Sequence, residues 1–568
     1  MQVKHLRSNL FVERQVERPV ATFLRNEQTW FSQFTSRQTR YEGWFLGCEA
    51  QLPHTYFKFL ERVTVTPYES LPPQEITVMT NQTRFSWEKA SLTFALSTKN
   101  GMVVQASQPV PFQLTLDMRG IYSTPDMGRI YRVQEENGLL ISYQDDTLIG
   151  PLFLHIRGPF RARSLIGAEW KHYAYPRDTA RNSGPDNLYC YELPPLLGER
   201  LNMGCGFSKE EALAGSLEAE QLILTQQPMP NAGNAQTIAQ TSVVDAMGYL
   251  TTKDGVYAGF PWFHQFWSRD ELITGLGLPH EAQIKMIERY VSLPLEHGEL
   301  PTYAGSGTTC ADGIGWLALL MKESGYIPSS AEVFFKGALE GLNQSRRTPS
   351  GLIWSGHNAT WMDTIGRSGF RLEIQCMYAL VQELLFTITG ENQYREQQKE
   401  ILQTIRHFMF VEGRLLDGLE DDMQPDLRVR PNIFLAYLLQ PSLLDGEAWE
   451  HCFETAILEL STPWGGLASL SSRDSAFQPL STGENNHSYH QGDSWFFVNN
   501  LAALAIKRHG SPKLQHIAEK LLASSTEEVL WQHFLGMPGE IASAQTGESW
   551  GCGIQGFSGG AYLKALGQ

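Results

Sequence analysis

The sequence predicts a chain of two parts, an antiparallel β-sandwich over residues 1–205 followed by an (α/α)6 barrel over residues 236–568. Short β-branched and aromatic runs dominate the first part, whereas capped helical patterns dominate the second. A helical segment over residues 206–235 connects them. At 568 residues the chain is long enough for several domains, so this division is physically reasonable.

The N-terminal part consists of apolar runs separated by Pro, Gly or Asn. Spacings of roughly 8–15 residues between such runs are typical of antiparallel strands in a sandwich. We therefore expect strands over residues 62–67, 76–79, 91–96, 102–106, 112–116 and 139–143.

The pattern changes to helices from Ser208 onward. Ser208 with Glu211, and Ser268 with Glu271, predict capping boxes. Further helical patterns cover residues 236–249, 280–292, 311–324, 330–344, 371–388, 393–409, 431–439, 446–460, 492–507, 511–523 and 558–566. Alternately short and long connections between these helices favour six hairpins closed into a barrel. A bundle or solenoid is the alternative, although no repeat of roughly 20–50 residues is visible.

Composition excludes several partners. Lys and Arg number 45 against 61 Asp and Glu, a net charge of −16, and such a surface repels nucleic acid and anionic lipid. Seven cysteines without a C-x-x-C pair favour a reducing compartment. We see neither a secretory leader nor a membrane-spanning stretch. We therefore expect a cytoplasmic protein without nucleic-acid or membrane partners.

Tryptophans gather in the predicted loops of the helical part. Ten of the fourteen follow residue 250, and most stand beside Gly, Pro, Asp or Glu. Core packing explains about half of them, since tryptophan is highly buried on average. Indole faces also stack on sugar rings in ligand clefts. We favour this second interpretation for Trp262, Trp267, Trp361 and Trp495.

Glycoside hydrolysis requires two carboxyl groups, one protonated and one ionised. The predicted loops offer several acids: Asp270, Asp312, Asp363, Glu373, Glu540 and Glu548. Each acid alone is more often solvated or a helix cap. Asp363 stands out, because burial against Trp361 would raise its pKa toward that of a general acid.

Other short motifs do not point to a different chemistry. Residues 556–560 match G-x-S-x-G and residues 551–556 match G-x-G-x-x-G, but too little chain follows either one. His487 and His490 near Glu484 are a weak zinc alternative, and residues 420–426 a weak calcium alternative. We expect no metal and no cofactor.

Six ordered blocks carry a family resemblance. They are A-G-F-P-W-F with W-S-R-D at 258–270, T-W-M-D at 360–363 with Glu373, D-L-R-V-R-P-N at 426–432, T-P-W-G at 462–465, Y-H-Q-G at 489–492 with Trp495, and G-E-I at 539–541. Over about residues 195–568 the chain resembles the amylo-α-1,6-glucosidase part of glycogen debranching enzymes. That group consists of (α/α)6-barrel glycosidases related in architecture to glucoamylases.

The resemblance implies roles for individual residues. Asp363 matches the family's general acid, and Glu540 matches its general base. Together with the loop tryptophans and acids above, the expected substrate-binding residues are Trp262, Trp267, Arg269, Asp270, Asp312, Trp361, Glu373, Arg430, His490, Gln491 and Trp495.

The implied activity is that of an inverting exo-glucosidase, which removes α-1,6-linked glucose stubs from glycogen or a related α-glucan. A glucoamylase-like α-1,4-glucosidase or a trehalase-like enzyme is the alternative on the same barrel, because loop shape sets linkage preference. A non-catalytic glucan-binding protein is the alternative of another class. The presence of both carboxylates argues against that last alternative.

Overall fold

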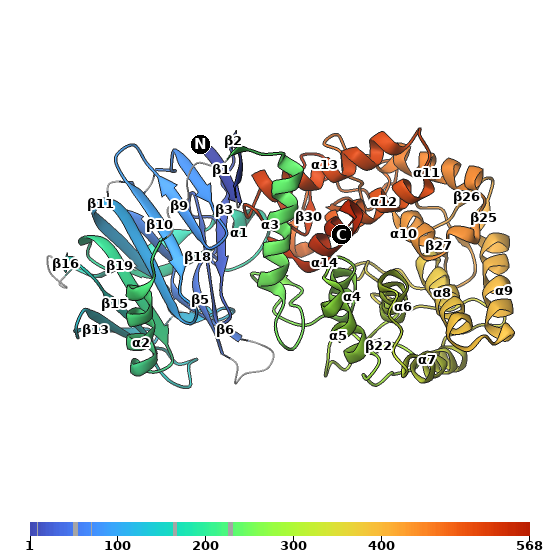
Figure 1. Cartoon of the computed structure of the whole chain (residues 1–568), viewed down its shortest axis with the longest axis horizontal. Helices are drawn as coiled ribbons and strands as arrows, with labels where there is room; N and C mark the ends of the chain where they lie inside the picture. The colour runs from blue at the N-terminus through green and yellow to red at the C-terminus, as the bar shows by residue number, and fades with distance from the viewer. Residues whose placement is uncertain are drawn as a thin grey trace. The chain divides into compact units, whose positions relative to one another are not determined.

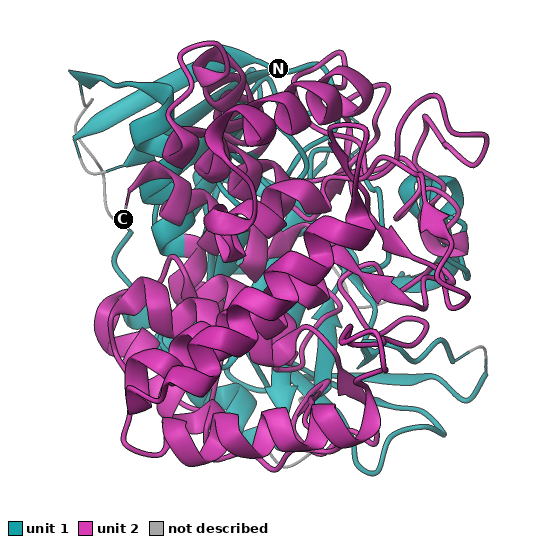
Figure 2. Cartoon of the chain, turned by 90° about the vertical axis from the view of Figure 1, so that its right-hand side faces the viewer, with its two compact units in different colours: residues 1–245, 529–537 teal, residues 246–528, 538–568 magenta. Residues whose placement is uncertain are grey.

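The computed structural model describes residues 1–7, 9–48, 55–66, 68–69, 71–125, 127–162, 167–224 and 231–567, and Figure 1 labels its elements. The chain divides into two compact units, residues 1–245 with 529–537 and residues 246–528 with 538–568 (Figure 2). Strands in sheets dominate the first unit and helices the second, which confirms the predicted order. The domain bounds at 205 and 236 stay a prediction.

The first unit contains a 15-stranded and a 5-stranded sheet. The main path of the larger sheet is β13-β14-β15-β19-β11-β10-β9-β8-β1-β2-β20. Its strands are β1 (Gln2–Arg7), β2 (Leu10–Gln15), β7 (Arg62–Val65), β8 (Glu75–Val78), β9 (Gln82–Ser86), β10 (Ser91–Leu96), β11 (Gly101–Leu116), β13 (Ile130–Glu135), β14 (Leu139–Gln144), β15 (Leu152–Arg157), β16 (Phe160–Ala162), β17 (Glu169–Ala174), β18 (Asn187–Glu192), β19 (Leu196–Gly206) and β20 (Asn231–Ala232).

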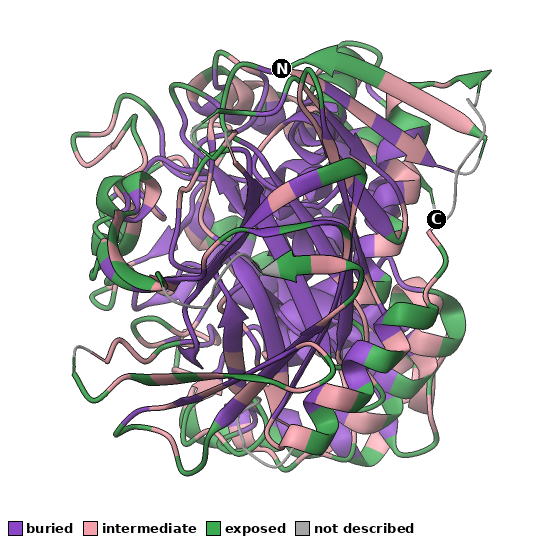
Figure 3. Ribbon diagram, turned by 90° about the vertical axis from the view of Figure 1, so that its left-hand side faces the viewer, coloured by how far each residue is buried: buried purple, intermediate pink, exposed green. Residues whose placement is uncertain are grey.

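The smaller sheet has the order β12-β6-β5-β4-β3 and is antiparallel throughout. Its strands are β3 (Ala21–Arg25), β4 (Thr29–Phe34), β5 (Gly43–Cys48), β6 (Thr55–Leu60) and β12 (Arg119–Gly120). Most residues of these five strands are buried (Figure 3), and Trp30 of β4 stacks on Phe45 of β5 with 3.8 Å between ring centroids.

The predicted strands correspond to β7, β8, β10, β11 and β14, with residue 67 outside the described residues. The prediction of separate strands over 102–106 and 112–116 is wrong, because both belong to β11. The register of β11 against β19 shifts between Gln105 and Val110, and residues 107–109 are exposed. The Pro-containing break that predicted a turn is therefore an irregularity at the sheet surface.

Every predicted helical segment from residue 236 onward corresponds to a helix. These are α3 (Ala235–Leu250), α4 (Ser268–Gly275), α5 (His280–Tyr290), α6 (Gly313–Ser324), α7 (Ala331–Ser345), α8 (Leu372–Thr389), α9 (Asn392–Met409), α10 (Asn432–Leu439), α11 (Gly446–Leu460), α12 (Phe496–His509), α13 (Gln515–Trp531) and α14 (Gly556–Leu566). Among the described residues, no helix is both long and apolar enough to cross a bilayer.

Alternate helices of the second unit contact one another in a closed cycle. Helix α4 packs on α6, α6 on α8, α8 on α10, α10 on α12, α12 on α14, and α14 on α4 again. The intervening helices α5, α7, α9 and α11 each contact members of this cycle. Every residue of α10 is buried, whereas α9 buries one face only, as expected for inner and outer helices.

One of the two predicted helix caps is wrong. Ser208 caps α2 (Lys209–Gln221), because its Oγ accepts a hydrogen bond from the Glu211 N–H at 3.2 Å. Ser268 is instead the first residue of α4, and its Oγ donates to the Pro301 carbonyl at 2.6 Å. The Glu271 carboxylate accepts hydrogen bonds from the Val256 N–H and the Tyr290 hydroxyl, so it does not complete a capping box.

Short strand pairs hold the loops that precede the inner helices. They are β21 (Gly259–Phe260) with β32 (Ile554–Gln555), β24 (Phe370–Arg371) with β27 (Gly418–Leu419) and β28 (Pro425–Asp426), and β29 (Ser494–Trp495) with β30 (Ile541–Ala542) and β31 (Ser549–Trp550). Two further pairs are β22 (Leu300–Pro301) with β23 (Thr309–Cys310) and β25 (Phe410–Val411) with β26 (Arg414–Leu415).

The α14–α4 contact predicts an unusual cost for alanine inside a helix. A Cβ added to Gly560 would lie 2.3 Å from the Thr274 carbonyl oxygen. We expect Gly560→Ala to destabilise the protein by about 1–3 kcal/mol through overpacking. Gly337, in α7, has open space where its Cβ would lie, so Gly337→Ala should stabilise by up to about 1 kcal/mol. Urea unfolding followed by circular dichroism measures both, and equal effects would contradict a tight α14–α4 contact.

Candidate functional site

A cavity of about 260 Å³ lies in the second unit, among the loops that lead into the helices of the cycle. Carboxylates and aromatic rings from distant parts of the sequence meet there. Its lining residues are Ala258, Phe263, Trp267, Arg269, Asp270, Ile273, Trp361, Asp363, Thr364, Asn486, Tyr489, Trp495, Phe497, Glu540, Gln555 and Phe557.

Both predicted catalytic carboxylates line this cavity. So do five predicted substrate-binding residues: Trp267, Arg269, Asp270, Trp361 and Trp495. The other predicted site residues lie outside the lining: Trp262, Asp312, Glu373, Arg430, His490 and Gln491. The cavity also includes residues that the sequence analysis did not select, among them Thr364, Asn486, Tyr489 and Gln555.

Asp363 is the more accessible of the two predicted catalytic acids. Its side chain is 38% exposed, and its Oδ2 lies 3.4 Å from Nη1 of Arg269. Desolvation raises the pKa of Asp363, the charge of Asp312 raises it further, and Arg269 opposes the shift. A raised pKa favours the protonated carboxyl that a general acid requires.

Glu540 is held in place by donors on both carboxylate oxygens. The Cys552 N–H donates to Oε2 at 2.6 Å, and the Tyr489 hydroxyl donates to Oε1. The backbone is fixed as well, since the Glu540 carbonyl accepts from the Phe496 N–H at 3.2 Å. Donors to both oxygens suit an ionised carboxylate.

Asp270 is a third carboxylate in the same cavity. Nε2 of Gln555 donates to its Oδ1 at 2.9 Å. Burial raises the pKa of Asp270 to about 7; the charges of Asp363 and Glu540 raise it and Arg269 lowers it. Three carboxylates therefore share one cavity in which Arg269 is the lining cation.

Aromatic rings form one wall and are fixed by hydrogen bonds. Trp495 Nε1 donates to the Tyr489 carbonyl at 2.7 Å, and the Trp361 ring meets the Trp495 ring edge-on at 5.5 Å. His490 lies behind this wall, stacked on Trp495 with centroids 4.8 Å apart, and its Nδ1 bonds to Oγ1 of Thr364 at 2.7 Å. A rigid, partly apolar wall of this kind suits the carbon face of a sugar ring.

A buried network supports the loop that carries Asp363. Arg367 donates to both oxygens of Glu373 at 2.5 and 3.0 Å, to Asp417 at 2.8 Å and to Oγ1 of Thr360 at 3.2 Å. Glu373 is thus fully buried and paired behind the cavity wall. The arginine ties the beginning of the T-W-M-D block to the protein interior.

Asn432 connects the same network to Trp361. Its Nδ2 donates to Oδ1 of Asp417 at 2.7 Å, and its Oδ1 accepts from Trp361 Nε1 at 2.7 Å. Arg430 donates from Nη1 to the carbonyls of Ser469 and His490 at 3.1 and 2.7 Å. Asp417 therefore lies at the centre of the contacts that orient this wall.

The remaining predicted residues occupy supporting or peripheral places. Oδ2 of Asp312 accepts from Nε of Arg269 at 2.6 Å, so it orients the arginine from outside the lining. Gln491 donates to the His487 carbonyl at 3.2 Å, and Trp262 is partly exposed.

The weak zinc and calcium alternatives of the sequence analysis can be compared with the metal-ligand clusters among the described residues. Among the described residues, the metal-ligand cluster is Glu61, Asp117 and Cys190 in the first unit, where Lys58 already pairs with both acids. Neither the Glu484–His490 loop nor the 420–426 loop forms such a cluster within the described part of the chain.

Residues 329–564 match the family model described as amylo-alpha-1,6-glucosidase. This match confirms the resemblance over that segment and indicates a glycoside hydrolase; Asp363 and Glu540 both lie within it. No curated protein matches the sequence.

Two crystal structures from Thermus thermophilus show limited similarity. An uncharacterized conserved protein is 15% identical, with 58% of this chain and 99% of that chain covered and a TM-score of 0.44. A GH63 mannosylglycerate hydrolase in complex with glucose is 13% identical, with the same coverage and TM-score.

The raised pKa of Asp270 predicts that Asp270→Asn increases the stability of the fold, and that the increase depends on pH. A carboxyl with a folded pKa near 7 and an unfolded pKa near 3.8 favours the folded state at low pH, and this stability is lost as pH rises through 7. The variant should therefore be more stable than wild type by on the order of 2 kcal/mol at pH 8, and by little at pH 4. Thermal unfolding at both pH values tests this, with the exposed Asp254→Asn as control; a pH-independent gain would contradict it.

The buried network predicts that Asp417→Asn lowers the free energy of unfolding strongly, although the two side chains have nearly the same size. It would remove the negative charge that Arg367 and Arg430 share in the interior, and removal of one partner from buried charges typically costs about 3–5 kcal/mol. Asp422, on the same loop, is exposed, so Asp422→Asn should stay within about 0.5 kcal/mol of wild type. Urea unfolding of the two variants measures the difference, and similar stabilities would show that the network contributes little.

Proposed function

We propose that this chain is an inverting exo-glucosidase that hydrolyses α-1,6-linked glucose stubs of glycogen or a related α-glucan. The observation that carries the proposal is that Asp363 and Glu540, from distant loops, line one cavity with Trp361 and Trp495. Acid, base and stacking surface are the groups that such a reaction uses. The family match over 329–564 supports the same class of reaction.

In this proposal Asp363 donates its proton to the glycosidic oxygen as the bond to the anomeric carbon breaks. Its raised pKa keeps the proton available, and its partial exposure lets the leaving group reach it. Arg269 lies 3.4 Å away and stabilises the carboxylate that forms when the proton leaves.

Glu540 accepts a proton from water as the water attacks the anomeric carbon from the opposite face. The Tyr489 hydroxyl and the Cys552 N–H orient its two oxygens. Inversion requires room for this water, so the two carboxyl groups are expected about 6.5–9.5 Å apart when substrate is bound. Regeneration then needs only a proton transfer from Glu540 back to Asp363 through solvent.

The proposal also includes the predicted barrel, the β domain, the glucan substrate and the cytoplasmic location. The closed cycle α4-α6-α8-α10-α12-α14 supports an (α/α)6 barrel, and the compactness of the first unit supports a separate β domain. A cavity of about 260 Å³ is small beside the ~300–1,000 Å³ of typical ligand pockets, which supports binding of a single terminal sugar ring. The glucan substrate and the cytoplasmic location rest on the sequence arguments.

A panel of substrates tests the linkage, and the anomer of the released sugar tests the stereochemistry. We expect β-glucose as the first product from panose, isomaltose and limit dextrin, observed by NMR before mutarotation, with little release from maltose. Release from maltose alone would favour the α-1,4-glucosidase, and release from trehalose the trehalase-like enzyme. With panose, whose only glucose product comes from the non-reducing end, initial release of α-glucose would contradict inversion.

Substitution of each carboxylate tests the assigned roles. Asp363→Asn and Glu540→Gln should each lower kcat by about 10²–10⁴-fold, with wild-type unfolding temperature. Glu548, another loop acid outside the cavity lining, is the matched control, and Glu548→Gln should retain kcat within about twofold. Retention of more than a tenth of kcat in either catalytic variant would make that assignment wrong.

A further inference from the structure

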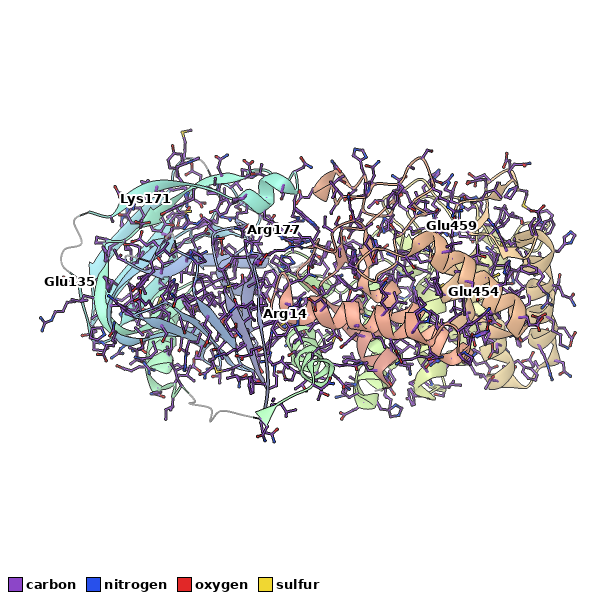
Figure 4. All side chains as sticks on the ribbon, turned by 90° about the horizontal axis from the view of Figure 1, so that it is seen from above. Arg14, Glu135, Lys171, Arg177, Glu454 and Glu459 are labelled. Carbon is purple, nitrogen blue, oxygen red and sulfur yellow. The ribbon has the colours of Figure 1, made fainter. Side chains whose placement is uncertain are left out.

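A second cavity of about 510 Å³ lies in the same unit, between the β25–β26 hairpin, the 427–433 segment and α11. Helix α11 also carries Glu454 and Glu459, labelled in Figure 4. The volume of the second cavity lies within the range of about 300–1,000 Å³ that small-molecule sites occupy. None of the residues assigned to catalysis above lines it.

Three of the residues that line this second cavity are arginines, in a chain whose net charge is −16. Arg414, Arg428 and Arg430 line it beside His451 and the acids Glu412 and Asp417. Arg428 also pairs at the surface with Glu420 and Asp426, at 3.5 and 3.4 Å. Both oxygens of Asp417 already accept hydrogen bonds, from Asn432 and from Arg367. Arg367 and Arg430 therefore share the negative charge of Asp417.

Arg430 forms the buried side of the second cavity. Its side chain is 1% exposed, and among the described residues its Nε has no hydrogen-bond partner. The closest acid, Asp417, lies 3.9 Å from this nitrogen. Burial lowers the pKa of Arg430 to about 10 against the influence of Asp417, and Arg367 lowers it further. An anion in the cavity would supply the missing charge and acceptor.

The wall of the second cavity belongs to the network behind the catalytic cavity. Asp417 is bonded to Asn432, which holds Trp361, and Arg430 is bonded to the carbonyl of His490. A group that contacts Arg430 from the second cavity is therefore two or three bonded contacts from the Asp363 loop. Such a chain of buried polar contacts can transmit a bias between sites.

We propose that this second cavity binds a small anion that carries a phosphate group, and that its occupancy stabilises the loop that carries Asp363. Arg414 and Arg428 are exposed at the rim and meet the anion first, while Arg430 contacts it inside. Arginine suits this ligand because its planar group binds phosphate oxygens through two parallel hydrogen bonds. Binding goes beyond the proposed hydrolysis and does not depend on it.

Isothermal titration of the full chain at constant ionic strength tests the binding. Inorganic phosphate, glucose 6-phosphate and adenosine monophosphate are the probes, which distinguish free phosphate from a sugar or nucleotide source, and glucose is the neutral control. We expect saturable binding of at least one phosphate probe with Kd below about 1 mM. Arg414→Ala with Arg428→Ala should weaken it at least tenfold.

Two controls locate the bound probe. Arg395 and Arg473 are exposed arginines of the same unit outside the second cavity, so their double alanine variant should keep Kd within twofold. Glu548→Gln should do the same, because Glu548 lines neither cavity. Equal loss in the Arg395/Arg473 variant, or no loss on removal of Arg414 and Arg428, would overturn the site, as would failure of every phosphate probe to bind.

Hydrogen–deuterium exchange tests the coupling without any need for activity. The bound probe should slow exchange in peptides that contain residues 360–364 as well as in 410–430, and neither effect should occur in the Arg414/Arg428 variant. Protection restricted to residues 410–430 would overturn the coupling. Since neither measurement uses hydrolysis, failure of the proposed glucosidase activity would leave both results interpretable.

Discussion

The burial of three carboxylates in one small cavity is the constraint on which the rest of this site depends. Asp270, Asp363 and Glu540 share their surroundings with Arg269. Desolvation and nearby negative charge raise the pKa values of Asp270 and Asp363 and so favour their protonated forms. Donors to both oxygens of Glu540, in contrast, suit its ionised form. Different surroundings thus prepare chemically similar side chains for different roles.

The buried network behind the wall shows how such a cavity is kept in shape. The groups that face the ligand are backed by Arg367, Asp417 and Asn432, whose hydrogen bonds leave the Thr360–Asp363 loop little freedom. Glu373 and Arg430, expected to bind sugar, belong to this backing. A buried charge needs partners wherever it lies. Many charged residues around a cleft therefore hold the lining residues in position and do not contact the ligand.

The same backing separates two cavities of opposite character. The catalytic cavity combines acids with aromatic rings, whereas the second cavity gathers arginines around an incompletely satisfied Arg430. A polar wall shared by two cavities is more responsive than an apolar one, because loss or gain of one charge changes every hydrogen bond that it makes. Asp417 is such a charge in this wall, because it accepts hydrogen bonds from both Asn432 and Arg367.

The sequence by itself determined the order of strands and helices and the two carboxylates that meet in the cavity, because helix periodicity, turn residues and the T-W-M-D and G-E-I blocks are local signals. Only the tertiary structure decided that β11 is one strand, that Ser268 is not a cap, and that Tyr489 rather than Gln491 lines the cavity. Neighbouring residues of a loop point in different directions, and the choice between them depends on partners such as Glu540 that lie far away in the sequence.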